Sequence, residues 1–90
     1  MMSADSRIRL LKARALMLLG HLDEAEKIVL ETTPPADMRE GETMTSEIWL
    51  DIQARKDGLV AAGALATKEQ MAEFGKRYTP PASLDYRMGS

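Results

Sequence analysis

The chain has no cysteine, a single histidine and only four aromatic side chains. Without cysteine it has no disulfide, thiolate metal site or thiol nucleophile, which fits a reducing, cytoplasmic location. With His21 alone, neither a multi-histidine metal site nor a histidine relay can be built. The sequence therefore predicts no catalytic residue, no cofactor and no metal site, and we expect that the protein is not an enzyme.

Long apolar runs and an excess of positive charge are also missing. The longest unbroken apolar run, residues 15–19, is far too short to cross a bilayer, and no signal-peptide pattern precedes it. The formal net charge of −2 argues against a nucleic-acid partner, which usually requires a concentrated basic surface. We therefore expect neither nucleic acid nor a membrane as a partner.

What is present is typical of a small helical domain. The chain has 90 residues, of which 44% are hydrophobic, so it makes one domain. Apolar residues recur mostly at helical spacing, which predicts an all-α fold with four helices and an extended C-terminal strap. We expect a helical hairpin over 1–33, a connector over 34–43, a second helix pair over 44–78 and the strap over 79–90.

Residues 10–30 predict two helices that meet at a tight corner, and the chain is organised around them. Gly20 stands at the corner, where glycine adopts a positive φ without steric cost. Asp23 is the expected cap of the second helix. The predicted buried stripe steps by three and four residues before the corner and continues after it. It consists of Ile8, Leu11, Ala15, Leu18 and Leu22, followed by Ala25, Ile28 and Val29.

The end of the first helix, residues 15–19, is apolar on every side. A helix with that composition is buried on every side. One following helix cannot cover it, so we expect that an outside surface also contacts this segment. Its predicted interaction residues are Leu16, Met17 and Leu19.

The third helix is expected to begin at Thr45 or Ser46. Its predicted buried residues are Ile48, Trp49, Ile52 and Leu59, with Trp49 as a core anchor. An exposed ladder is predicted at Glu47, Asp51 and Arg55, which are four residues apart. The phase of Leu59 favours continuation of the helix to Gly63; the alternative is a break at Asp57-Gly58, a common turn dipeptide.

Residues 67–70, Thr-Lys-Glu-Gln, match a capping box and predict the start of the fourth helix. Its apolar stripe is predicted at Met71, Phe74 and Tyr78. Prolines then end the helix, and three apolar residues alternate with polar ones in the strap. They are Leu84, Tyr86 and Met88, of which Tyr86 is the expected anchor.

The hairpin resembles one tetratricopeptide repeat. That family places a small residue, a large one, a glycine and an alanine at fixed intervals, which here fall on Ala13, Leu16, Gly20 and Ala25. The resemblance implies that the alanines let the two helices approach closely. Leu22 stands where the family has an aromatic residue, and the closing proline is displaced. The alternative is an ordinary helical hairpin with glycine at its corner.

Residues 39–88 resemble the C-terminal end of large bacterial proteins that join a galactose-mutarotase-like β-sandwich to tetratricopeptide repeats. The resemblance rests on residues 39–42 (Arg-Glu-Gly-Glu), 47–49 (Glu-Ile-Trp), 80–81 (Pro-Pro) and 84–88 (Leu-Asp-Tyr-Arg-Met). It implies that this chain is the last helical module of a longer protein. The β-sandwich is absent from the chain, so no carbohydrate chemistry is transferred with the resemblance.

These observations favour a non-catalytic module that binds protein or caps a repeat array. Its expected partners are its own upstream repeats or a second copy in a homodimer. The alternative is an accessory domain that supplies loop residues such as Arg39 and Glu40 to a carbohydrate-active catalytic domain.

Charge is also segregated along the chain, with basic residues concentrated in 5–14 and acids in excess in 23–51. Either the basic first helix pairs with an acidic neighbour, or the two charged segments form two solvated faces of opposite sign.

Overall fold

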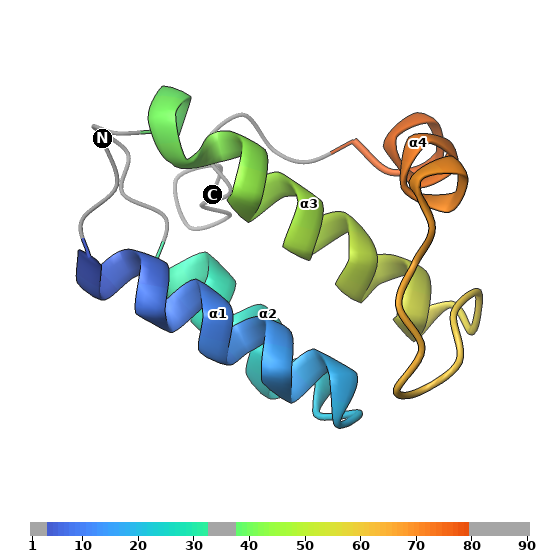
Figure 1. Ribbon diagram of the computed structural model, residues 1–90, viewed down its shortest axis with the longest axis horizontal. Coiled ribbons are helices and arrows are strands. Elements are labelled where there is room, and N and C mark those ends of the chain that lie inside the picture. The colour runs from blue at the N-terminus through green and yellow to red at the C-terminus, as the bar shows by residue number, and fades with distance from the viewer. Residues whose placement is uncertain (1–3, 33–37, 80–90) are drawn as a thin grey trace, which may run out of the picture.

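The computed structural model describes residues 4–32 and 38–79, and within these residues the fold is all-α. Its helices are α1 (Ala4–Leu18), α2 (Leu22–Thr32), α3 (Met38–Lys56) and α4 (Lys68–Arg77). Figure 1 shows α1 and α2 as an antiparallel hairpin, with α3 lying along it and α4 running across the end of α3. The contacts agree, since α1 packs most extensively on α2 and α3 contacts the other three helices.

Two helices end in the same way, at a glycine with positive φ. Gly20 has φ 92° and the next backbone N–H, of His21, donates to the carbonyl of Leu16 at 2.9 Å. At the end of α3, Gly58 has φ 77° and the N–H of Leu59 donates to the carbonyl of Ala54 at 2.9 Å. This is the Schellman pattern, which satisfies carbonyls that the end of a helix leaves unpaired. The predicted conformation of Gly20 is confirmed.

The structure therefore corrects the predicted course of α3 at both ends. The helix begins at Met38, inside the expected connector, and not at Thr45 or Ser46. It ends at Lys56 and does not continue through Gly58. Helix-forming residues dominate the early turns, and the single glycine among them, Gly41, costs only about 1 kcal/mol. The later glycine stops the helix because it takes the left-handed conformation.

The core is formed where α1, α2 and α3 meet. On α1, Leu10, Ala13 and Met17 are buried, and Ala25 and Val29 face them from α2. From α3, Ile48, Trp49 and Ile52 complete the core as predicted, and Trp49 is 7% exposed. Leu59 was predicted to join them, but it follows the helix end and is 40% exposed.

The predicted stripe of α1 is also wrong. Ile8, Leu11 and Ala15 are exposed, and the buried face lies on the opposite side of the helix. With 3.6 residues per turn, two apolar stripes fit on one helix, and only one of them meets α2 and α3. The segment 15–19 is likewise not buried on every side, because Ala15 and Leu19 are exposed.

Helix α4 begins as predicted. The hydroxyl oxygen of Thr67 accepts from the backbone N–H of Gln70 at 3.1 Å, and the Gln70 side chain accepts from the backbone N–H of Thr67 at 2.9 Å. Phe74 is buried, and Met71 and Tyr78 pack against the core. The strap, including Tyr86, lies outside the described residues, as does Pro34-Pro35.

Candidate interaction surface on α1

The outer face of α1 carries a continuous line of exposed apolar side chains. Ile8 is 63% exposed, Leu11 is 48% exposed and Leu19, just past the helix end, is 73% exposed. Ala4 and Ala15 are exposed on the same side. These five residues, which we call the outer stripe, follow one another at steps of three or four residues and therefore share one face. They lie opposite the buried residues of α1.

Basic side chains flank the outer stripe. Lys12 lies beside it on one edge, together with Asp5, and Arg7 and Arg14 lie along the other; all four are exposed. Across the described residues, the bases that form ion pairs are Arg55 and Lys56, so none of the four bases of α1 is neutralised there. Helices α2 and α3 pack against α1, but their carboxylates form no ion pair with these bases among the described residues. Because Asp5 is the only acid of α1, bases predominate along the outer stripe.

Helix α2 exposes a different kind of surface. On α2 the exposed residues are Asp23, Glu24, Lys27 and Glu31, all charged.

Asp23, which the sequence predicted as the cap of α2, is not the cap, since the helix begins at Leu22 and the carbonyl of His21 accepts from the N–H of Ala25 at 3.0 Å. Its carboxylate lies in the first turn, near the positive end of the helix dipole.

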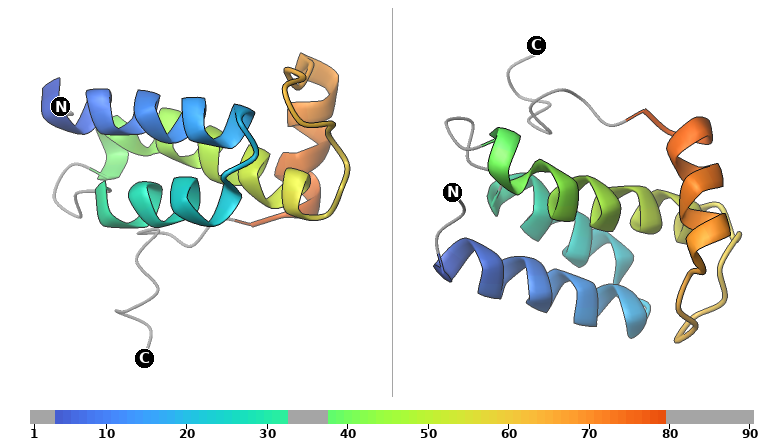
Figure 2. Two further views of the ribbon diagram at one scale, coloured as in Figure 1. Left: turned by 90° about the horizontal axis from the view of Figure 1, so that it is seen from below. Right: turned by 45° about the horizontal axis from the view of Figure 1, so that its top comes forward.

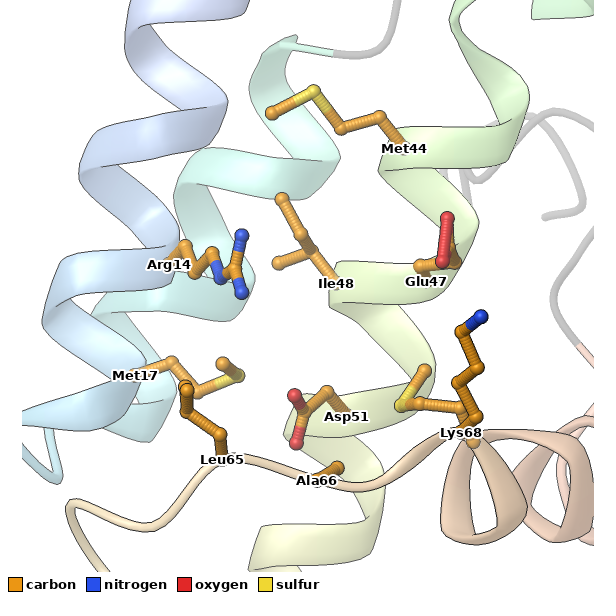
Figure 3. Close-up of a pocket in the computed structure, with 10 residues that line it drawn as sticks. Arg14, Met17, Met44, Glu47, Ile48, Asp51, Leu65, Ala66 and Lys68 are labelled. Atoms are coloured by element: carbon orange, nitrogen blue, oxygen red, sulfur yellow. The ribbon is translucent and has the colours of Figure 1, made fainter.

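A groove of about 450 Å³ opens between α1, α3 and the segment leading into α4 (Figure 3). Its apolar lining comes from Met17, Met44, Ile48, Leu65, Ala66 and Met71. Its charged lining comes from Arg14, Glu47, Asp51 and Lys68. Arg14 thus stands between the groove and the outer stripe, so the two surfaces adjoin.

The structure distributes the predicted interaction residues over different environments. Leu19 is exposed, Leu16 is half-buried against the core, and Met17 is buried with one side lining the groove. Arg39 and Glu40 lie in the first turn of α3, where the described structure includes the backbone only. Ile8, Leu11 and Ala15 were predicted as core residues and instead form the outer stripe. The signal that marks them is a second apolar stripe half a turn from the first.

The sequence also misplaced Arg55. It was predicted to stand at the end of an exposed ladder, but its side chain is buried and only Glu47 of that ladder is exposed. Its Nε donates to Oδ1 of Asp51 at 2.7 Å, and Nη1 donates to the carbonyl of Ala61 at 3.3 Å. Nη2 donates to the carbonyl of Ala64. The guanidinium therefore holds the segment between α3 and α4 against α3.

A polar contact also joins α2 to α3. The carboxylate of Glu26 accepts from Nε2 of Gln53 and from Nζ of Lys56, the latter at 2.8 Å. Asp23 lies 3.4 Å from the same ammonium group. The hydrogen bond to Glu26 raises the pKa of Lys56 above its ordinary value of 10.5. This contact fixes the two helices relative to each other at the end where α3 stops.

Comparison of the chain with protein-family models, curated proteins and solved structures finds no match. Among the described residues, no helix has the length and apolar character needed to span a membrane. The same part of the chain holds no group of three or more histidine or acidic side chains placed to bind a metal ion.

Proposed function

We propose that the chain is a non-catalytic helical module that binds protein through the outer stripe of α1. The supporting observation is the double-faced character of this helix: Leu10, Ala13 and Met17 build the core while a second apolar line remains exposed. Single exposed apolar residues are common on proteins, but a continuous line along one helix is typical of an interaction surface. On this proposal the partner is a helix, supplied by an upstream repeat that the module caps or by another protein.

Helical spacing supports a helix as the occupant. The outer stripe runs along the axis of α1 and contains both small and large residues, with Ala4 and Ala15 interspersed among Ile8, Leu11 and Leu19. Large side chains of one helix fit between those of another when both follow the three- and four-residue rows. An extended strand would instead bring its side chains at a spacing of two residues, which does not match this line.

The proposal is tested with a double variant, Ile8→Ser with Leu11→Ser. Both side chains are exposed, so we expect unchanged melting of the variant. The probe is an amphipathic helical peptide with leucine at heptad spacing and glutamine on its flanks, followed by fluorescence anisotropy. We expect the wild-type chain to bind it and the variant to bind about tenfold or more weakly.

A matched control is Lys27→Ser with Glu31→Ser, which alters an exposed charged face of α2. This control is expected to bind the peptide like the wild type. If the wild-type chain does not bind the peptide, or if the outer-stripe variant binds it equally well, the proposed docking surface is wrong.

A further inference from the structure

We infer that the helix which docks on the outer stripe carries acidic side chains on its flanks, and that it is not a second copy of this chain. The inference rests on the proposed function and adds the chemistry of the partner. It is carried by the three bases beside the stripe, Arg7, Lys12 and Arg14. Each is exposed, and none is neutralised by an ion pair among the described residues.

The three bases lie where the flanks of a docked helix come to rest. A partner helix seated on Ile8, Leu11 and Ala15 brings its own flanking positions over Lys12 on one side and over Arg7 and Arg14 on the other. Acidic residues at those positions form ion pairs across the rim of the contact, and basic residues there meet like charge. Flanking charges of this kind select the partner more than they strengthen the contact.

A second copy of the chain does not offer the acidic flanks that these bases select. In a symmetric pair formed through the outer stripe, each copy brings an excess of positive charge to the contact, because Arg7, Lys12 and Arg14 outnumber the one exposed acid of α1, Asp5. An asymmetric contact requires an acidic helix face with exposed apolar residues. The exposed face of α2 is acidic, but its exposed residues are all charged, so it lacks the apolar line.

The surface around the outer stripe fits a partner helix better than an anionic membrane. A basic helix with an exposed apolar face also fits a membrane surface. A membrane is broad, however, and α2 lies alongside α1 with Asp23, Glu24 and Glu31 exposed (Figure 2). The outer stripe also lacks tryptophan and tyrosine, which are enriched at the membrane–water interface, since its members are alanine, isoleucine and leucine. A narrow acidic helix contacts α1 without covering the acids of its neighbour.

The test compares three helical peptides with the same leucine stripe and with glutamate, glutamine or lysine on the flanks. Binding to the full chain is measured by anisotropy at low and at high salt. We expect the glutamate peptide to bind about tenfold more tightly than the lysine peptide at low salt. Because salt screens exposed charges, the difference is expected to shrink at high salt.

Charge-neutralising variants assign the preference to the three bases. In Arg7→Gln with Lys12→Gln and Arg14→Gln, the affinity for the glutamate peptide is expected to fall to that of the glutamine peptide, whose binding stays unchanged. The control Lys27→Gln with Lys76→Gln removes two exposed bases from α2 and α4 and is expected to keep the preference.

The outcomes separate the two proposals. If all three peptides bind equally and lose affinity in the Ile8→Ser, Leu11→Ser variant, the docking surface stands and the acidic partner is overturned. If none binds, the proposed function fails as well. A dimer in sedimentation velocity that the Leu11→Ser change dissociates would overturn the exclusion of a second copy. Binding to phosphatidylcholine vesicles that contain phosphatidylserine, tighter than binding to the glutamate peptide, would overturn the choice of a protein partner.

Discussion

The guanidinium of Arg55 lies 2.7 Å from the carboxylate of Asp51, measured from Nε to Oδ1, and both groups belong to the last turns of α3. This pair orients the guanidinium so that its two remaining nitrogens reach the carbonyls of Ala61 and Ala64. A single buried charge thus connects the end of α3 to the segment that leads into α4. Together with buried Phe74 and the hydrogen bond from the Tyr78 hydroxyl to Asp57, it fixes the position of α4 against α3.

Arg55→Lys is expected to destabilise the protein by about 1–3 kcal/mol. Lysine keeps the charge, but its ammonium group cannot make three diverging hydrogen bonds to Asp51 and to both carbonyls. The measurement is urea unfolding. Arg9→Lys, on the exposed surface of α1, is the matched control and is expected to change stability by less than about 0.5 kcal/mol. Equal effects of the two changes would show that the hydrogen bonds of the buried Arg55 guanidinium do not stabilise the fold.

Gly20→Ala and Gly75→Ala are expected to change stability in opposite directions. A Cβ built at either glycine meets no other atom within 4 Å, so backbone conformation alone decides the sign. Gly20 has φ 92°, which alanine adopts at a cost of about 1–2 kcal/mol. Gly75 lies within α4, where alanine is favoured over glycine by about 0.5–1 kcal/mol.

Thermal melting of the two variants checks this pair, with the wild type measured alongside. We expect a lower melting temperature for Gly20→Ala and a higher one for Gly75→Ala. A Gly20→Ala variant that melts at or above the wild-type temperature would contradict the left-handed helix end at this corner.

Stability is expected to fall as the pH rises above about 10, through Lys56 and Tyr78. The hydrogen bond to Glu26 raises the pKa of Lys56 above 10.5, and the hydrogen bond from the Tyr78 hydroxyl to Asp57 raises the pKa of that phenol above 10.0. In both cases the folded pKa lies above the unfolded value. The stabilisation is therefore complete below the unfolded pKa and is lost as the pH rises through the folded pKa.

Urea unfolding from pH 8 to about pH 11 measures this loss. In the double variant Lys56→Gln with Tyr78→Phe, the decline at alkaline pH is expected to be smaller than in the wild type. Lys76→Gln, which changes an exposed lysine of α4, is expected to leave the decline unchanged. A double variant with the wild-type pH profile would rule out these two contacts as its source.

Local signals in the sequence determined where the chain turns and where most of its helices lie. Gly20 is identified by its place after an apolar run, and the capping box at Thr67 by side chains that bond to backbone groups three residues away. Each depends on atoms within a few residues, so neighbouring sequence is sufficient to predict it. The same reasoning did not decide whether the third helix continues through Gly58 or ends there, because a glycine that continues a helix and one that ends it differ only in φ.

The tertiary structure decided which apolar surface is buried. Helix α1 carries two apolar stripes, and the periodicity of either one satisfies the same helical pattern. The core forms on Leu10, Ala13 and Met17 because that side meets both α2 and α3, and Ile8 and Leu11 are left facing outward. The burial of Arg55 was decided in the same way, since its carbonyl partners lie six and nine residues away in a segment whose path depends on packing. Burial is a property of what a side chain meets across the fold, and periodicity within one helix does not contain that information.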